Sequence, residues 1–411
     1  MVKLARIALR NIGRNRRRSV LSATATAIAT MSMVALASYI NGMRLDMQSN
    51  VSDLVTGHVQ VRHREYDKNE LFNPLHLRVE RPAELLALLD QEPDVASAVA
   101  RLPLPVGVFR GAETTGAMAV GMDMQRERQF MRVDRLLTSG RLPEAGANEA
   151  VVGTALAASL GVKPGDRITL LSSTMRRSSN ALTFTLVGLL DFPVASMNRT
   201  HILLPLDRAE VLARMGDSAI EVLVKARQEA KIPAIRARVD RILADGGWTE
   251  LRARTWTEAS YILAFFEMAE GMYLIISLVF FLLASTVLVN TTMMVVFERT
   301  REIGTVGALG MRGREIVRMF FLEALALSVI GAAGGVLLGL GIAVPLSLLG
   351  IDMSSATQGV SFEISNVVFA RPRALTTVLI FVYAVAISCL AALLPARRAA
   401  KIQPVEALRA I

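Results

Sequence analysis

The chain has 411 residues, of which 52% are hydrophobic, and its formal net charge is +10. Its mean hydropathy of +0.42 is too high for an ordinary soluble domain. A single cysteine, Cys389, excludes a fold held together by disulfides within the chain. Composition therefore favours a membrane protein whose polar part is stabilised by its own hydrophobic core.

Four segments are long and apolar enough to cross a bilayer, which takes about 20 residues of helix. We predict transmembrane helices over residues 19–43, 269–297, 319–351 and 374–396, each built around an uncharged run. The first segment follows three consecutive arginines and contains a small-residue stretch at 35–37, so it also resembles a secretory signal peptide. Its uncharged run is longer than a usual signal core and continues past the candidate cleavage site, which favours a retained helix.

Basic residues gather at the ends of these segments. Residues 1–18 carry seven Lys or Arg and no acid, residues 298–318 carry five arginines against three glutamates, and residues 397–411 carry four basic residues against one acid. The positive-inside rule places these three stretches in the cytoplasm and leaves 44–268 and 352–373 outside. The high net charge thus indicates topology and contact with anionic membrane lipids, and it does not indicate nucleic acid binding.

The outside region, residues 44–268, has the sequence pattern of a mixed α and β domain. Residues 57–63 alternate apolar and polar side chains, as a half-buried strand does. Further strands are expected within 149–173, 181–192, 219–226 and 249–256, and helices over 82–91 and 231–247. We therefore expect a membrane protein with four transmembrane α-helices and a large α+β extracytoplasmic domain inserted between helices 1 and 2.

Two finer features of this domain are also expected. The excursion near residues 83–130 is a candidate separate lobe. Residues 257–273 contain no helix breaker, so we expect one continuous helix from the domain into the second span.

The sequence shows no catalytic constellation. It has no G-x-x-x-x-G-K-[ST] motif, so any ATP-driven work would need a partner subunit that holds the ATP and Mg²⁺, and no cofactor is expected on this chain. His58 and His63 lie five residues apart on a predicted strand and point to opposite faces, which is poor geometry for a metal pair. We expect neither a metal site nor enzymatic activity.

Two features of the third span bear on packing and function. Gly331, Gly335 and Gly339 form overlapping small-xxx-small steps, which allow another helix to approach closely. Glu323 is an acid near the cytoplasmic end of the span. Intramembrane acids are candidates for a proton path, but a single carboxylate at this depth favours a side chain that reaches the interface or pairs with the connector.

The connector at 298–318 is charged and helix-prone. Glu298, Arg299, Arg301 and Glu302 continue the second span, and Arg314 belongs to the following helix. Between them Ile303, Val306 and Leu309 recur every three residues until Gly310, which predicts a short amphipathic helix with a glycine stop. Residue patterns alone fit both an interfacial helix with solvated charges and a helix that docks on another protein.

Four stretches, taken together, indicate a family. They are SYINGMRLDMQ (38–48), TGHVQVRHREY (56–66), ERTREIGTVGALGMRGREIVRMFFLEAL (298–325) and LLPARRAAKIQPVEALR (393–409). They resemble the ABC-transporter permeases of the MacB, lipoprotein-releasing (LolC/LolE) and FtsX superfamily, whose order of spans and outside domain is similar over the whole chain. The first two stretches and the size of the outside domain are most similar to the lipoprotein-releasing branch.

The resemblance implies a permease in the bacterial inner membrane with a periplasmic MacB-like core domain. It would pair with a second permease chain, as a homodimer or a LolC/LolE-like heterodimer, and bind a cytoplasmic ABC ATPase dimer. The ATPase-coupling residues would be Glu298, Arg299, Arg301, Glu302, Ile303, Val306, Leu309, Gly310 and Arg314. ATP hydrolysis would move the periplasmic domain, which is mechanotransmission.

The resemblance also implies a substrate cavity between the first and second spans. Flexible side chains suit such a lining, although each also fits ordinary packing or lipid contact. The candidates are Met31, Met33, Tyr39, Met43, Met268 and Met272. Arg176 and Arg177, in the place of the family's carrier-binding hook, are candidate contacts with a periplasmic lipoprotein carrier, although a plain solvated hairpin fits them as well.

Several functions fit this family. Lipoprotein extraction from the inner membrane is favoured. A MacB-like export permease for another amphiphile and an FtsX-like signal transmitter that transports nothing stay open. A secondary transporter is disfavoured, because four spans with one intramembrane acid provide no ion site built from repeats.

Overall fold

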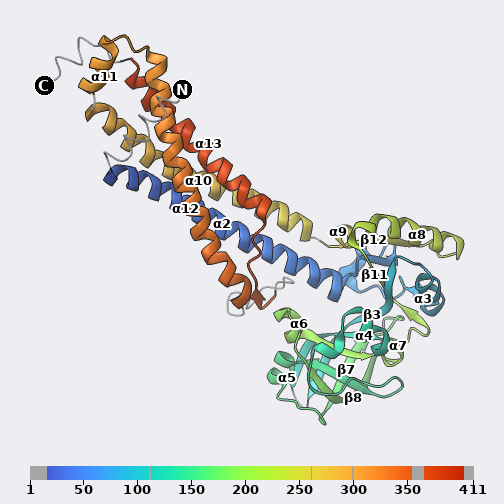
Figure 1. Ribbon diagram of the computed structural model, residues 1–411. Helices are drawn as coiled ribbons and strands as arrows, with labels where there is room; N and C mark the ends of the chain where they lie inside the picture. Colours follow the sequence, from blue (N-terminus) through green and yellow to red (C-terminus); the bar gives the residue numbers. More distant parts are fainter. Residues whose placement is uncertain (1–15, 111–112, 261, 299, 354–364, 402–411) are drawn as a thin grey trace. The chain divides into compact units, whose positions relative to one another are not determined.

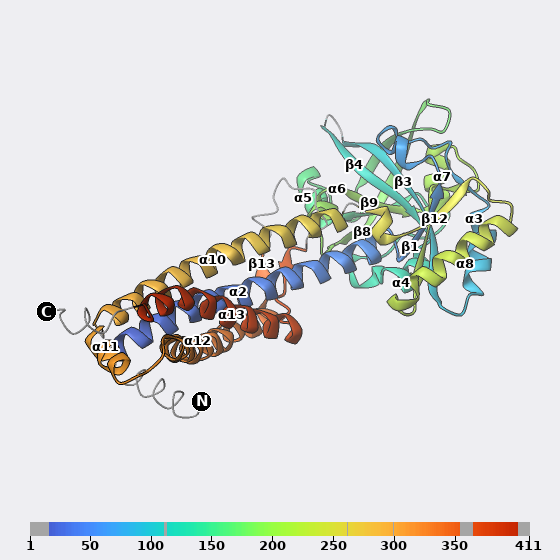
Figure 2. The ribbon, with the colours of Figure 1, turned by 90° about the horizontal axis from the view of Figure 1, so that it is seen from above.

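Four long helices form the membrane unit of the computed structural model, which describes residues 16–110, 113–260, 262–298, 300–353 and 365–401. They are α2 (Arg16–Asn50), α10 (Ile262–Glu298), α12 (Gly313–Leu349) and α13 (Ala374–Ala399). Each is long and apolar enough to cross a membrane. Figures 1 and 2 show α12 beside α13. The predicted architecture, with a large domain between the first and second of four spans, is confirmed.

Helix ends differ from the predicted boundaries because charged flanks continue the helices. The helix α2 continues to Asn50, beyond the predicted end at residue 43. The helix α12 begins at Gly313, inside the predicted connector, where Glu315 Oε2 accepts a hydrogen bond from Arg312 N–H at 2.9 Å. Between α10 and α12 lies the short helix α11 (Thr300–Ala308).

The membrane unit buries small and aromatic side chains and exposes aliphatic ones. Phe281 of α10, Ala332 of α12 and Ala384 of α13 belong to one core cluster. On the outer side of these helices, Leu282 of α10 is 59% exposed and Leu337 of α12 is 72% exposed. Helices that are apolar all round are expected where the surrounding solvent is lipid.

The extramembrane domain, residues 45–265 with 352–367, is built around a ten-stranded sheet. Its order is β12-β1-β11-β3-β4-β9-β6-β8-β5, with β7 paired to β3 and β8. The strands are β1 (Val59–His63), β3 (Val95–Arg110), β4 (Glu113–Met122), β5 (Leu137–Gly140), β6 (Glu149–Gly153), β7 (Arg167–Ser173), β8 (Ser179–Leu190), β9 (His201–Pro205), β11 (Glu221–Ala226) and β12 (Leu251–Thr255). The pairs β4–β9 and β6–β8 are parallel, whereas the other pairs are antiparallel.

Helices and short elements complete the chain. The domain contains α3 (Pro82–Asp90), α4 (Met124–Phe130), α5 (Thr154–Leu160), α6 (Ala195–Thr200), α7 (Leu206–Ala213), α8 (Ile232–Asp245) and α9 (Trp256–Ala259). Single turns are η1 (Val51–Val55), η2 (Asp67–Phe72), η3 (Val133–Arg135) and η4 (Glu229–Lys231). Two-residue strands are β2 (Val79–Glu80), β10 (Ser218–Ala219), β13 (Ile351–Asp352) and β14 (Val367–Val368).

The predicted lobe at 83–130 is wrong. Leu85 and Leu89 of α3 belong to one core cluster with Val224, whereas Leu102 and Leu104 of β3 belong to another. The 16-residue strand β3 runs through both cores, so the chain segment 83–130 is shared between them.

The predicted continuous helix over 257–273 is also wrong. Ser260 has an extended backbone, with φ −126° and ψ 149°, and separates α9 from α10. At its other end, Thr255 N–H donates to Glu258 Oε2 at 3.0 Å in a capping box, which fixes the start of α9.

Candidate functional site

The connector helix α11 is attached to the membrane unit by one apolar side chain. Ile303 is 5% exposed and packs in a cluster with Val296, Phe320 and Ala396. Gly310 has φ +96° and Met311 N–H donates to the carbonyl of Val306, which is the backbone geometry of a glycine helix stop. The structure therefore has a short helix with a glycine stop in the connector.

The other face of α11 is open. Val306 is 37% exposed and Leu309 is 83% exposed. The side chains of Glu298, Arg301, Glu302 and Arg314 are exposed around them, whereas Arg299 lies outside the described residues. The connector therefore exposes two apolar side chains together with several charged ones, a mixture that a protein partner or a membrane surface could cover.

The three glycines of α12 lie directly against α2. A Cβ built on Gly331 would lie 2.6 Å from the carbonyl oxygen of Ala23, and one on Gly335 would lie 2.5 Å from that of Ala27. For Gly339 the nearest atom is Cβ of Val34, at 2.8 Å. Backbone contact of this kind is what small-xxx-small steps permit.

Glu323 lines a small cavity of mixed polar and apolar lining in the membrane unit. The cavity, of about 30 Å³, is also lined by Ser19 and Ser22 of α2 and by Thr291 and Thr292 of α10. Glu323 is only 9% exposed, so its side chain lies among the packed helices, and its expected role at the interface or with the connector stays a prediction. Its carboxylate lies among hydroxyl groups of neighbouring helices, and the space is large enough for one water molecule.

The candidate cavity residues have different environments. Met33 is 1% exposed in the core cluster of the bundle, so in this arrangement it is a packing residue. Met268 and Met272 are more than half exposed on α10, and Met31, Tyr39 and Met43 are partly buried on α2.

Arg176 and Arg177 lie in the turn of a tight hairpin. Strands β7 and β8 pair as far as Ser173 and Ser179, so five residues form the connection. Thr174 and Ser178 close it, with their hydroxyl oxygens 2.8 Å apart. Both arginines are exposed, and the turn does not extend into a hook.

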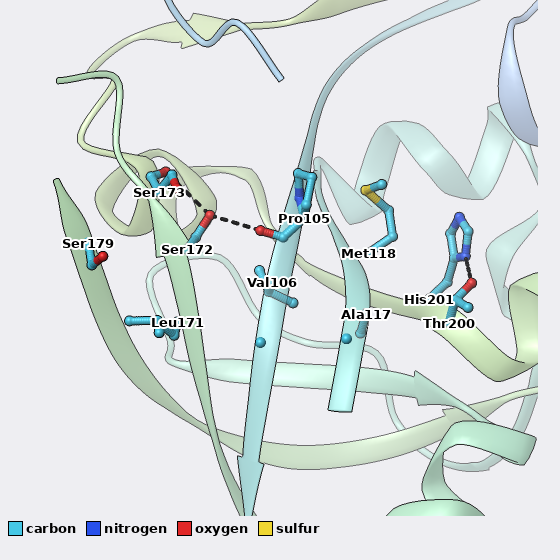
Figure 3. A pocket seen from close by; sticks show the side chains of 12 residues that line it. Pro105, Val106, Ala117, Met118, Leu171, Ser172, Ser173, Ser179, Thr200 and His201 are labelled. Atoms are coloured by element: carbon cyan, nitrogen blue, oxygen red, sulfur yellow. Dashed lines mark hydrogen bonds between the residues drawn. The ribbon is translucent and has the colours of Figure 1, made fainter. Parts of the chain in front are cut away.

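The sequence analysis missed a groove on the extramembrane domain. This groove, of about 670 Å³, lies along β3, β4 and β7, and we call it the strand groove. Figure 3 shows Pro105, Met118 and His201 neighbouring one another in its lining. Burial, and secondarily the charge of Arg101, lower the pKa of His201 to about 4, so its imidazole is neutral at physiological pH. Because the lining comes from strands distant in sequence, no local motif marks it.

Among the described residues, no three His, Cys, Asp or Glu side chains gather in a way that could hold a metal ion. His58 is buried, and its Nδ1 accepts a hydrogen bond from Ala226 N–H at 2.9 Å. Burial lowers the pKa of His58, which is consistent with a neutral ring that serves as an acceptor.

Four membrane-spanning helices, a large domain after the first, and an exposed connector helix between the second and third define a membrane permease. Two family descriptions match consecutive parts of the chain: the MacB-like periplasmic core domain over residues 19–242 and the FtsX-like permease C-terminal domain over 274–404. The chain belongs to the MacB/FtsX/LolC family of ABC-transporter permeases.

Individual relatives match different extents of the chain. The lipoprotein-releasing system transmembrane protein LolC of Neisseria meningitidis is 23% identical over 95% of this chain and 94% of its own length. The pyoverdine export ATP-binding/permease protein PvdT of Pseudomonas putida is 30% identical over 46% of this chain and 26% of its own length. The macrolide export ATP-binding/permease protein MacB of Brucella abortus is 40% identical over 29% of this chain and 16% of its own length.

Solved structures give a weaker comparison. The match to the periplasmic region of MacB from Actinobacillus actinomycetemcomitans covers 50% of this chain and 92% of the MacB chain, with 12% identity and a TM-score of 0.38. The match to the extracellular domain of the ABC-type transporter YknZ from Gram-positive bacteria covers 48% of this chain and 99% of the YknZ domain, with 14% identity and a TM-score of 0.36.

Proposed function

We propose that this permease uses ATP hydrolysis by a separate cytoplasmic ATPase to extract lipid-anchored proteins from the inner membrane and present them on the periplasmic side. The chain would place its termini and its connector in the cytoplasm and its large domain in the periplasm. It would work as a dimer of permease chains with a dimer of ATPases. Handover to a periplasmic carrier completes this proposal.

The ATPase part of the proposal rests on the different environments of two apolar side chains of the connector, one buried and one exposed. Ile303 attaches the helix to the bundle, while Leu309 is 83% exposed among charged side chains. An interfacial helix would bury such a leucine in lipid, whereas a docking helix uses it as an apolar anchor on its partner, and the ATPase titration below distinguishes the two. The end-to-end similarity to a LolC protein supports the lipoprotein part.

A second candidate function is export of another amphiphile. Two export proteins, one named for pyoverdine and one for macrolides, are 30% and 40% identical to parts of this chain. Both functions use the same coupling through α11, so substrate response distinguishes them. An FtsX-like signal transmitter would respond to neither substrate.

The test is ATPase activity of the permease with its candidate ATPase in lipid nanodiscs, titrated with a synthetic triacylated lipopeptide. We expect stimulation in the wild type and its loss in Leu309→Asp, which removes the anchor without disturbing the buried cluster. Val211→Asp is the matched control, because Val211 is also an exposed apolar residue, at 47%, on helix α7 of the extramembrane domain.

Three outcomes separate the candidates. Stimulation that Leu309→Asp abolishes and Val211→Asp retains supports the proposal. ATPase activity that depends on the permease but does not change with lipopeptide favours export of another amphiphile or signalling. Equal activity of Leu309→Asp and wild type overturns the coupling role of α11.

A further inference from the structure

We propose that a recess of about 260 Å³ in the extramembrane domain, lined in part by the turn η1 that follows α2, binds an aliphatic chain of the transported amphiphile. We call it the α2-end recess. It is lined by Leu54, Val55, Arg62, Tyr66, Glu70, Leu71, Asn73, Arg101, Pro103, Pro105, Met118, Val120, Met122, Met197, His201 and Glu221. This inference rests on the proposed function, because it names where part of the substrate binds.

The floor of the recess is apolar and rich in methionine. Met118, Val120 and Met122 alternate along β4 and therefore point to one face of the strand. Met197 of α6 and Leu54 of η1 complete the floor, and of these five residues all but Met118 are buried. Unbranched thioether side chains adapt to aliphatic ligands of different shape, which suits a binder of acyl chains.

The charged side chains of the lining are already paired with opposite charges of the domain. Arg62 lies 2.7 Å from Glu221 and 3.0 Å from Glu70, and Arg101 lies 2.7 Å from Glu127. An anionic ligand would have to displace one of these carboxylates, and a cationic ligand one of the guanidinium groups, at the cost of a partly buried charge. The lining therefore favours an uncharged, apolar occupant over an ion.

The rim segment η2 is held in place at its start and presents apolar residues at its end. Asp67 lies 2.6 Å from Arg254 and also pairs with Arg252. At the other end, Leu71 and Phe72 are 99% and 83% exposed. Leu71 belongs to the lining of the recess, so a fixed turn holds an exposed aliphatic side chain at its mouth. Contact with a ligand would remove that surface from water.

The recess continues into the strand groove. Pro105, Met118 and His201 line both spaces, and Figure 3 shows them at the end of the strand groove away from Ser179. A chain that begins against Leu54 can therefore leave along β3 and β4 towards Ala117. The two spaces together suit an extended aliphatic ligand better than a compact one.

The recess also touches the end of the first membrane-spanning helix. Arg101 donates a hydrogen bond to the carbonyl of Leu54, and Lys225 lies 2.6 Å from Asp53 in the same turn. An occupant would contact Leu54 and Val55 directly. A ligand that fits one arrangement of this turn better than another shifts the population towards it, so occupancy is linked to the end of α2.

The first test places a reporter in the recess of the full-length permease, reconstituted with its ATPase in nanodiscs. In a Cys389→Ser background, Met118→Cys is labelled with an environment-sensitive fluorophore. We expect a saturable blue shift with the triacylated lipopeptide and none with the same peptide lacking acyl chains. Glu84→Cys on α3, whose native side chain is about half exposed, is the control and should not respond to either.

The second test fills the recess. Met118→Trp should raise the lipopeptide concentration for half-maximal ATPase stimulation at least tenfold, whereas Val211→Trp should not change it. A silent reporter, or an equal shift with the unacylated peptide, overturns the proposed site. If the reporter shifts while the lipopeptide does not stimulate the wild-type ATPase, the site stands and the proposed transport function fails. If the lipopeptide stimulates the ATPase but the reporter fluorescence does not shift, the transport function stands and the proposed site fails.

Discussion

Arg101 of β3 and Glu127 of α4 form a two-pronged ion pair inside the extramembrane domain. Arg101 Nε and Nη2 donate to the two carboxylate oxygens of Glu127 at 2.7 and 3.0 Å. The two residues are 2% and 0% exposed. Because Arg101 also donates to the carbonyl of Leu54, this pair determines where the end of α2 is held.

Breaking the pair from one side should be costly. Glu127→Ala leaves a buried guanidinium without its carboxylate, and we expect the free energy of unfolding to fall by about 3–5 kcal/mol. Both tryptophans, Trp248 and Trp256, lie in this domain, so denaturant unfolding followed by tryptophan fluorescence of the full chain measures it.

The control for this prediction is an exposed pair in the same region. Arg128 and Asp134 lie 3.5 Å apart and their side chains are 57% and 54% exposed. Asp134→Ala should therefore change the free energy of unfolding by less than about 1 kcal/mol. A similar loss in Asp134→Ala and Glu127→Ala would show that burial of the Arg101–Glu127 pair has no special weight.

Replacing the adjacent glycines Gly334 and Gly335 of α12 by alanine should change the stability of the membrane unit in opposite directions. Gly335→Ala places a Cβ 2.5 Å from the carbonyl oxygen of Ala27, and we expect overpacking to cost about 1–3 kcal/mol. Gly334 has nothing within 4 Å of such a Cβ, so Gly334→Ala should gain about 0.5–1 kcal/mol from helix propensity.

The only cysteine provides the measurement for these two variants. Cys389 is 6% exposed, so a thiol-reactive fluorogenic dye reports unfolding of the membrane unit on heating. The unfolding midpoint should fall in Gly335→Ala and rise or stay constant in Gly334→Ala. If both midpoints move in the same direction by the same amount, α12 does not depend on close contact at Gly335.

Glu210 gives the extramembrane domain a pH dependence. Burial, and secondarily the charge of Asp217, raise the pKa of Glu210 to about 7 from an ordinary value of 4.5. A raised carboxyl pKa favours the folded state fully below about 4.5, and this contribution is lost as the pH rises through 7.

Glu210→Gln, which stays neutral, should therefore become more stable relative to the wild type as the pH rises from 4.5 to above 7. Thermal unfolding followed by tryptophan fluorescence across this range checks the difference at each pH. Glu84→Gln on α3 is the control for removing an exposed acid. The lowered pKa of His201 acts in the opposite direction, with stability lost as the pH falls from about 6.5 towards 4, and comparison at equal pH cancels it. A difference between Glu210→Gln and wild type that does not depend on pH would refute the assignment.

Features set by local sequence could be predicted. Uncharged length marked the four spans, alternation marked β1, and the glycine stop at Gly310 marked the end of the connector helix. Each depends on neighbours within a few residues, where periodicity and backbone preference act.

Features set by distant contacts could not be predicted. The α2-end recess joins Leu54 to Met118 and Met197, which lie far apart in the chain and meet only through the sheet order. Ser260 is a different case: no glycine or proline marks the break between α9 and α10, so the residue pattern carried no signal for it.

Ile303 of α11 and Leu309, which directly follows the helix, should separate stability from coupling. Ile303→Ala removes a buried side chain from the cluster with Phe320, and we expect a loss of about 2–5 kcal/mol. Leu309→Ala changes a residue that is 83% exposed, so its effect on stability should stay within about 0.5 kcal/mol. The dye reaction of Cys389 on heating measures both variants.

For ATPase binding, we expect Leu309→Ala to have the larger effect and Ile303→Ala the smaller one. At a temperature where both permease variants are folded, Leu309→Ala should weaken ATPase binding by roughly tenfold, which corresponds to about 1.4 kcal/mol and is typical of an apolar anchor. Ile303→Ala should bind nearly as the wild type does, because its side chain faces the bundle. Pull-down titration of the ATPase with nanodisc-embedded permease measures this. Weak binding in Ile303→Ala with normal binding in Leu309→Ala would mean that the buried face of α11, and not its open face, determines ATPase binding.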